Sequence, residues 1–273
     1  MAKKKKQDNA PVWLAFVADW HINSTIGLCP GPVQLDDGGQ YQPSDEQAWL
    51  WDRWREFWAE VGTLDGNRVA VVVGDVVESF HHGSVQLITL NQAVELDAAV
   101  AAAGPMLNAV DQVYVIRGTE AHGGGAGFKE ELFAKRIGAT SDGNGNTSRW
   151  HMAQQFGGVR FDVAHHPRTS SMVTYSRDWA AARQASQVAL EYDEERVDRP
   201  DVVIRAHCHY LGRGYHRDTL AVFLPPWVLT TAFGYRKGAG HRVEPPGGVL
   251  FQCKGGEYTW RPRTYKPPRA APW

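Results

Sequence analysis

Short apolar runs alternate with longer amphipathic stretches along most of this chain. Apolar runs of this kind, bounded by glycine, proline or charged residues, are typical of buried strands. The pattern predicts five strands, over residues 13–18, 69–73, 113–116, 159–164 and 202–205. Between them, apolar residues recur at helical spacing. This spacing predicts four helices: one that begins near Ser44, and three over residues 84–103, 127–137 and 174–192.

The helix that opens near Ser44 has the most specific local signals. Ser44 to Gln47, SDEQ, resembles a capping box. An aromatic face follows at helical spacing and is expected to pack inward, made of Leu50, Trp54, Phe57, Trp58 and Val61. The alternative interpretation of these tryptophans is a platform on which nucleic-acid bases stack. Residues 23–43 are rich in Gly, Pro and Asp and predict a long loop, and Pro105 is expected to end or kink the helix over residues 84–103.

Strands that alternate with helices indicate an α/β fold. The expected organisation is one domain over residues 11–260, between a disordered basic N-terminus, residues 1–10, and a basic, proline-rich tail, residues 261–273. Two more apolar runs, near residues 219–224 and 248–253, make the last third rich in strands. These runs are expected to contribute to a second sheet that completes a sandwich.

Composition narrows the function classes only slightly. The 273 residues have a formal net charge of −1, so nothing suggests a surface built to coat nucleic acid. No apolar run approaches the roughly 20 residues that span a bilayer, and no signal peptide follows the basic run at Lys3–Lys6. The three scattered cysteines do not form a disulfide framework, which fits a reducing cytoplasm.

Side chains that can bind metal follow each of the five predicted strands. Carboxylates or imidazoles follow every strand, in the segments Asp19-Trp20-His21, Gly74-Asp75 with His81-His82 beyond, Gly118-Thr119-Glu120-Ala121-His122, His165-His166, and His207-Cys208-His209. Eight of the 11 histidines lie in these segments, a clustering that is hard to reach by chance. Because ligands bind at the carboxyl ends of strands in open α/β sheets, the sequence predicts one shared site.

Asp and His together suit a divalent metal of borderline hardness, such as Mn, Fe, Zn or Ni. In an extended segment, residues two apart project to the same side, so Asp19 with His21, and His207 with His209, could each grip metal. The candidate ligands are too many for one ion and suit two, as in phosphatases and nucleases. Asp75 follows a glycine that lets the backbone come close, which makes it the natural bridging carboxylate.

The ordered series DWH, GD, GTEAH, HH and HCH resembles the calcineurin-like metallophosphoesterase superfamily, from Asp19 to His209. The resemblance implies two central mixed β-sheets flanked by helices, an α/β/β/α sandwich. It also implies that Asp19, His21 and His209 hold one divalent ion, that His165 and His207 hold a second, and that Asp75 bridges both. Mn is the favoured metal, with Fe, Zn, Ni or Mg as alternatives.

The third segment departs from the family's G-N-H pattern. The asparagine that usually ligates the second metal is absent, so Glu120 or Thr119 must fill the gap, and Glu120 is favoured because a carboxylate is the better ligand. His122 would then protonate the leaving oxygen. The choice between His165 and His166 stays open, with His165 preferred. Four residues are candidates for contact with phosphate or substrate: His81, His82, Arg117 and His166.

The resemblance implies a metal-dependent phosphoric ester hydrolase in which a hydroxide bridging the metals attacks phosphorus. A phosphodiesterase, possibly a nuclease, is the expected activity, with nucleic acid as a possible partner and no membrane. The alternatives are a phosphomonoesterase acting on proteins or nucleotides, and a scaffold without catalysis. The GTxxH variant is similar to phage and prophage phosphoesterases, which implies the host cytoplasm.

Overall fold

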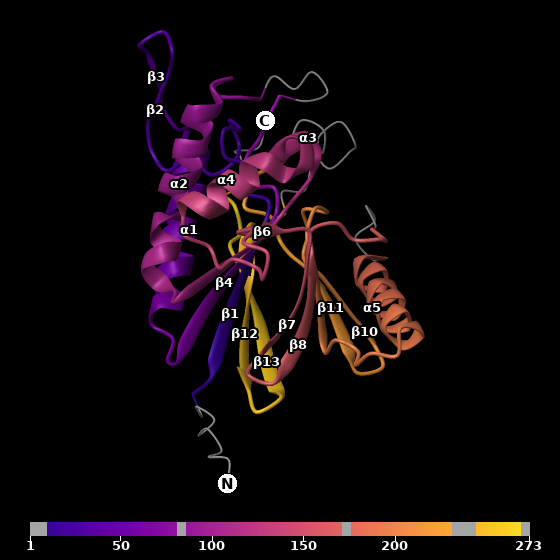
Figure 1. Ribbon diagram of the computed structural model, residues 1–273. Coiled ribbons are helices and arrows are strands. Elements are labelled where there is room, and N and C mark those ends of the chain that lie inside the picture. Colours follow the sequence, from indigo (N-terminus) through magenta and orange to yellow (C-terminus); the bar gives the residue numbers. More distant parts are fainter. Residues whose placement is uncertain (1–9, 81–85, 171–175, 231–243, 269–273) are drawn as a thin grey trace.

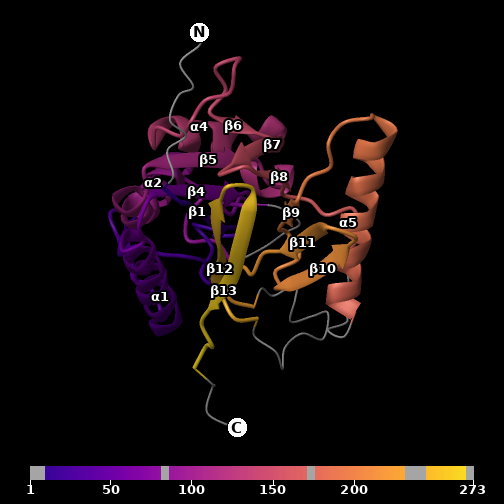
Figure 2. The same cartoon turned by 90° about the horizontal axis from the view of Figure 1, so that it is seen from below.

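The computed structural model describes residues 10–80, 86–170, 176–230 and 244–268. Two β-sheets pack face to face, and helices cover the outer face of each (Figure 1). The view from below separates α1 and α2 on one side from α5 on the other (Figure 2). The fold is therefore the four-layer α/β/β/α sandwich that the sequence predicts.

The first sheet has six strands in the order β13-β12-β1-β4-β5-β6. Its strands are β1 (Val12–Val17), β4 (Asn67–Val73), β5 (Gln112–Ile116), β6 (Ser148–Arg149), β12 (Gly247–Lys254) and β13 (Glu257–Thr264). The four strands from β1 to β6 are parallel, so their carboxyl ends share one edge, whereas β12 runs antiparallel to β1.

The second sheet has five strands in the order β10-β11-β9-β8-β7. Its strands are β7 (His151–Phe156), β8 (Val159–Ala164), β9 (Val202–Arg205), β10 (Gly212–His216) and β11 (Thr219–Phe223). Within it, β8, β9 and β11 are parallel. A separate two-stranded ribbon, β2 (Val33–Gln34) with β3 (Gln40–Tyr41), lies inside the expected loop over residues 23–43.

Among the described residues, five helices and a 3-10 turn connect these strands. They are α1 (Asp45–Gly62), α2 (Gln92–Ala109), α3 (Glu120–Gly123), the 3-10 turn η1 (Gly125–Gly127), α4 (Phe128–Arg136) and α5 (Arg177–Glu194). The capping box of α1 is confirmed, because the Ser44 hydroxyl accepts from the Gln47 backbone and the Gln47 side chain reaches back to Ser44. Pro105, by contrast, lies inside α2, which continues to Ala109, so of the two expectations for Pro105, an end or a kink, the helix end is wrong.

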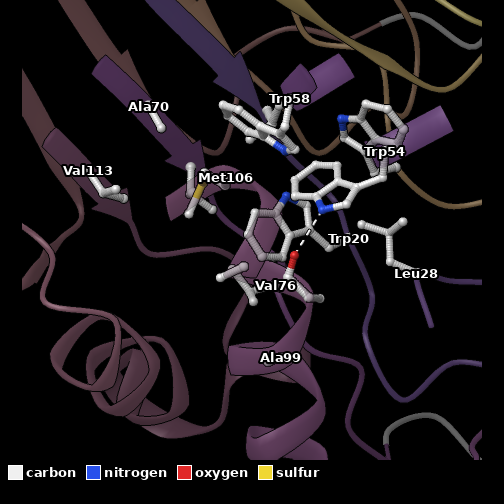
Figure 3. Packing of buried hydrophobic residues seen from close by; sticks show 14 of the residues in the cluster. Trp20, Leu28, Trp54, Trp58, Ala70, Val76, Ala99, Met106 and Val113 are labelled. Carbon is white, nitrogen blue, oxygen red and sulfur yellow. Dashed lines mark hydrogen bonds between the residues drawn. The ribbon is translucent and has the colours of Figure 1, made fainter. Parts of the chain in front are cut away.

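Three buried clusters fill the spaces between the four layers. One lies between the first sheet and α1, α2 and α4, one between the sheets, and one under α5. The first contains Trp20, Trp54 and Trp58 packed edge to face, and the Trp54 indole donates to the Ala102 carbonyl at 2.9 Å (Figure 3). Trp54 and Trp58 are fully buried, so they form core and not a stacking platform.

The last strands differ from the sequence prediction. The run near residues 219–224 joins the second sheet as β11, but the run near residues 248–253 is β12 and pairs with β1 in the first sheet. β13 extends to Thr264 and Tyr265 is buried, so ordered structure continues past the expected boundary at residue 260. Apolar periodicity alone gives no information about which sheet a strand joins. No helix of the described residues is long and apolar enough to cross a membrane.

Candidate metal centre

The five polar segments meet where the carboxyl ends of the two sheets come together. Asp19, Asp75 and Thr119 follow strands of the first sheet, whereas His165, His207 and His209 follow strands of the second. Ligating atoms of Asp19, His21 and His209 lie within 4.8 Å of one another, as do those of Asp19, Asp75 and His165. A third group, His165, His166 and His207, meets the same limit. The structure therefore brings side chains of all five segments together in one region.

Sharp backbone turns, and not extended segments, aim these side chains. Asp19, His21, Asp75, His207 and His209 all have φ between 45° and 68°, in the left-handed region. Non-glycine residues avoid this region at a cost of order 1–3 kcal/mol each, and such residues gather at functional sites. The expectation that each pair would project from one side of an extended segment is wrong, although both pairs do converge.

Two glycines allow the strand ends of the first sheet to approach the second. Gly74 has φ +78°, and a Cβ atom there would lie 2.4 Å from Nδ1 of His165. At Gly118, a Cβ atom would lie 2.2 Å from the Asp75 nitrogen. Side chains at either position would push the loops apart, so the glycine before Asp75 does permit the close approach that the sequence predicts.

Outer hydrogen bonds fix which nitrogen of two histidines faces the centre. His165 Nδ1 donates to the Val73 carbonyl at 2.7 Å, so its Nε2 is the nitrogen that faces Asp75, at 3.0 Å from Oδ2. His21 Nδ1 donates to Glu78 at 2.6 Å, so Nε2 faces His209 Nε2, at 3.1 Å. A carboxylate or carbonyl behind the imidazole is the usual support of a metal-ligating histidine.

The buried carboxylates of the centre have few positively charged or donor groups to balance them among the described residues. Neither oxygen of Asp19 accepts a hydrogen bond within the described residues, although the side chain is fully buried, and the nearest imidazole nitrogen is His209 Nε2 at 3.5 Å. Burial alone would lower the pKa of His165, but the charge of Asp75 raises this pKa to about 10. A field that draws a proton onto a buried imidazole also favours a divalent cation, so the residues present fit a metal.

Glu78 joins a candidate ligand to the candidate acid. Its two carboxylate oxygens accept from Nδ1 of His21 at 2.6 Å and Nδ1 of His122 at 3.0 Å. Burial acts to raise the pKa of Glu78, but the hydrogen bonds from the two histidines hold it at about 2. Burial acts to lower the pKa of His122, whereas Glu78 and the charge of Asp75 raise it above its ordinary value. Glu78 and Asp75 thus favour the protonated form of His122.

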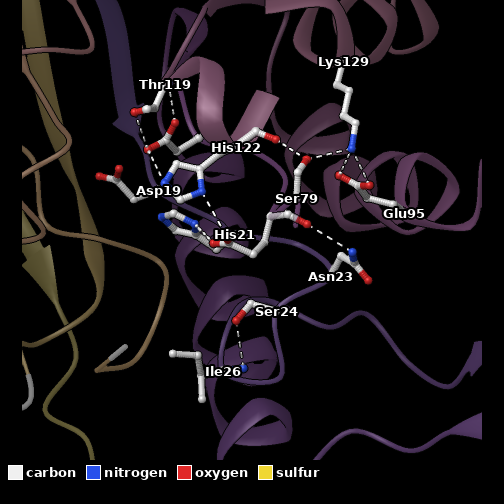
Figure 4. A network of polar contacts seen from close by, with 12 residues as sticks. Asp19, His21, Asn23, Ser24, Ile26, Ser79, Glu95, Thr119, His122 and Lys129 are labelled. Atoms are coloured by element: carbon white, nitrogen blue, oxygen red, sulfur yellow. Dashed lines mark hydrogen bonds and ion pairs between the residues drawn. The ribbon is translucent and has the colours of Figure 1, made fainter. Parts of the chain in front are cut away.

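A second set of contacts holds the backbone of His122. The Ser79 hydroxyl donates to the His122 carbonyl, and Lys129 contacts both Ser79, at 2.7 Å, and Glu95 (Figure 4). His122 Nε2 lies 3.9 Å from Asp75 Oδ2, so this nitrogen faces the cluster. Neither Glu78 nor this network was predicted, although Glu78 follows Asp75 by only three residues.

The third segment contributes Thr119 and not Glu120. The Thr119 backbone nitrogen donates to Asp75 Oδ1 at 2.6 Å, and its hydroxyl donates to Asp75 Oδ2 at 3.2 Å. Glu120 is exposed, and its Oε1 accepts from the Ala126 nitrogen at 3.3 Å. The preference for Glu120 as a ligand is therefore wrong in this geometry, because the chain turns into α3 directly after Thr119 and carries the Glu120 side chain away.

Arg117, expected to contact phosphate, has other partners. Its donors reach Ser148 at 2.8 Å, the Ala126 carbonyl at 3.1 Å and Glu131 at 3.2 Å, so it ties the loop before α4 to β6. His166 lies among the candidate ligands, at 3.2 Å from the Thr119 hydroxyl. His81 and His82 lie outside the described residues. Cys208 belongs to no metal-ligating group of the described residues and packs under α5.

Glu130, which the sequence analysis missed, lies beneath the centre. It is fully buried, and its Oε1 accepts from the backbone nitrogens of Asp75 at 3.0 Å and Gly118 at 2.9 Å. Burial, and then the charge of Asp75, raise the pKa of Glu130 to about 7. One carboxyl group thus holds together the two loops that supply Asp75 and Thr119. A glutamate on a predicted helix gives no signal of such a role.

Comparisons with known proteins give a likeness in fold. No family model matches the chain, and no curated protein matches it. Among solved structures, Vacuolar Protein Sorting 29 from Cryptosporidium parvum is 13% identical, with a TM-score of 0.44, over 94% of this chain and 98% of that one. A novel archaeal phosphodiesterase is 13% identical, with a TM-score of 0.43, over 92% of this chain and 99% of that one.

A predicted phosphoesterase from Streptococcus pneumoniae is 8% identical, with a TM-score of 0.38, over 93% of this chain and 99% of that one. At these identities and TM-scores the likeness carries no argument about activity. What defines the class of site is the set of buried carboxylates and converging imidazoles: a candidate centre for divalent metal on an α/β/β/α sandwich.

Proposed function

We propose that this protein is a metal-dependent phosphoesterase with two divalent ions, and that it hydrolyses phosphodiesters. The observation that carries the proposal is that Asp19, His21 and His209 lie close together while His165 and His207 lie beside Asp75. Asp19 is buried and accepts no hydrogen bond from the part of the chain that the structure describes. When bound, two such ions lower the pKa of a water molecule between them and offset charge on the phosphate.

The chain's own residues would divide the remaining work. Asp19, His21 and His209 would hold one ion, His165 and His207 the other, and Asp75 would contact both. His122, protonated and oriented by Glu78, would donate its Nε2 proton to the leaving oxygen. A positioned general acid contributes typically ~10²–10⁴-fold to the rate.

Within the described part of the chain, two cations near the candidate site, Lys129 and Arg117, already have acidic partners, which favours a diester over a monoester as substrate. Lys129 is bound to Glu95 and Ser79, and Arg117 is bound to Ser148 and Glu131. A monoester carries up to two negative charges at neutral pH and gains more from an arginine or lysine clamp than a diester, which carries one. A nucleic-acid strand is one such diester, and we propose it as a substrate class to be tested.

Hydrolysis of bis-p-nitrophenyl phosphate and p-nitrophenyl phosphate by chelator-stripped protein tests the proposal. Mn, Mg, Zn, Ni and Fe are added back separately. We expect cleavage of the diester that depends on metal and is lost in Asp75→Asn, while His216→Ala, changed at the opposite end of the second sheet, retains it. Cleavage of the monoester alone would overturn the diester assignment. A protein that binds metal but cleaves neither ester would support a scaffold.

Single- and double-stranded DNA and RNA extend the test to nucleic acid. Binding through phosphate contacts weakens steeply with salt. We expect cleavage of at least one of these polymers, with an affinity that falls between 50 and 200 mM salt, as is typical of phosphate contacts. A small diester that is cleaved while every polymer stays intact would exclude a nuclease but keep the phosphodiesterase.

A further inference from the structure

Three imidazoles gather on the side of Asp75 that faces the second sheet. The ring centroids of His165 and His166 are 4.9 Å apart, those of His165 and His207 are 5.3 Å apart, and those of His166 and His207 are 4.7 Å apart. One nitrogen of each lies within 4.8 Å of the other two. This set contains one more histidine than the family resemblance assigns to the second metal.

The backbone explains how two neighbouring residues reach one place. β8 ends at Ala164, and the chain bends at His165 and His166. In a continued strand these side chains would project to opposite faces. Pro167 follows directly, and a proline keeps the preceding residue out of the helical region, so His166 cannot start a helix that would carry it away.

Thr119 marks the position where the family asparagine is missing. Its hydroxyl lies 3.2 Å from His166 Nε2 and 3.3 Å from His207 Nδ1. A threonine side chain is shorter than the asparagine it replaces, and two ring nitrogens, one from His166 and one from His207, lie within hydrogen-bonding distance of its hydroxyl. Glu120 is directed to Ala126 instead.

We propose that the second metal position is a three-histidine site, in which His166 takes the place of the absent asparagine. His165 and His207 supply the other two nitrogens, and Asp75 supplies the carboxylate. This inference rests on the proposed function, because it specifies one of the two ion positions. It reassigns His166 from substrate contact to metal ligand.

The donor set also determines which ions this position favours. An imidazole in place of an amide oxygen makes the site richer in nitrogen. Imidazole suits Zn, Ni and Fe, whereas carboxylate, carbonyl and water suit Mg and Mn, and Co²⁺ binds more tightly than Mn²⁺ in the general affinity order of divalent metals. The second position should therefore bind Co²⁺ or Zn²⁺ well ahead of Mg²⁺. The first position, with Asp19, His21 and His209, has only two imidazoles.

Calorimetric titration of chelator-stripped protein with Co²⁺, together with elemental analysis after gel filtration, tests the inference without an activity assay. The parent should bind two ions per chain. His166→Ala should keep the first and lose the second, with an affinity that falls by more than about 100-fold, beyond the ~10–100-fold typical of a lost outer partner. His166 is exposed, so its truncation leaves the core intact.

Two variants separate the alternatives. Glu120→Ala should bind two Co²⁺ ions with parental affinity, and so should the control His216→Ala. Loss of the second ion in Glu120→Ala would overturn the three-histidine site. So would loss of the second ion in Thr119→Val while His166→Ala still binds two ions. A parent that binds no second ion would contradict the proposed function itself, whereas two ions retained by His166→Ala would refute only this inference.

Discussion

Glu130 provides a test of how the centre is held in shape. At pH 6, below its raised pKa of about 7, the group is mainly protonated, and its Oε1 accepts from the nitrogens of Asp75 and Gly118. Glu130→Ala leaves both buried N–H groups without an acceptor. Each such loss costs about 1–3 kcal/mol. The cavity adds roughly 1 kcal/mol, at about 24 cal/mol per Å³.

The expected loss for Glu130→Ala is therefore about 3–7 kcal/mol in the free energy of unfolding. With roughly 2–4 °C of Tm per kcal/mol, the melting temperature should fall by about 6–28 °C. Glu130→Gln has the shape of the protonated acid and keeps an oxygen for both N–H groups, so it should lose less than about 1.5 kcal/mol. Exposed Glu194→Ala, the control, should stay within about 0.5 kcal/mol of the parent.

Urea and thermal unfolding at pH 6, with chelator present and tryptophan fluorescence as the signal, measure these differences. Calorimetric titration with Co²⁺ then gives the effect on metal, which we expect to be a loss of about 10–100-fold in Glu130→Ala, the range for an outer partner. Parental stability in Glu130→Ala would refute the reasoning. Equal losses in the Ala and Gln variants would show that the retained acceptor oxygen does not matter.

Three further variants test other parts of the account. Glu78→Gln should keep two metal ions but lower kcat for the diester by about 10²-fold, because His122 loses the carboxylate that orients it and raises its pKa. An unchanged kcat would exclude that role. Partial burial acts to raise the pKa of Glu131, but hydrogen bonds from residues around β6 lower it to about 2, from an ordinary 4.5. The ionised Glu131 should therefore stabilise the folded protein by about 1–3 kcal/mol after allowance for solvent, above pH 4.5, and this stabilisation should be lost as pH falls toward 2. In urea unfolding, Glu131→Gln should be less stable than the parent at pH 6 and as stable as the parent near pH 2. A difference that stays constant with pH would contradict this. Trp54→Ala should lose about 3–5 kcal/mol of unfolding free energy, whereas exposed Trp179→Ala should lose under about 0.5; similar melting temperatures for the two would contradict the core assignment.

Sequence periodicity predicted the parts of the fold that depend on local pattern. β8 and β9 have the predicted bounds, and the capping box of α1 forms as expected. The short strand β6 and the exposed β13 lack an apolar run, so pattern could not reveal them. The position of β12 beside β1 depends on long-range pairing, which no local signal encodes.

The candidate site was predictable where residue type alone sets the chemistry. Asp19, His21, Asp75 and His209 were identified because Asp and His at strand ends have few other reasons to recur. Glu120 was preferred over Thr119 from ligand strength, but the direction of each side chain depends on where α3 begins. The supports Glu78 and Glu130 act through distances across the fold, and their residue type has no specific signal.

The central claim is that two metal ions share Asp75. Anomalous diffraction from crystals soaked with Mn²⁺ or Co²⁺ tests it most directly. The account predicts two peaks ~3.5–4 Å apart, the spacing of two-metal sites, one beside Asp19 and His21 and the other beside His165 and His207. A single peak, or two peaks that do not flank Asp75, would contradict the account.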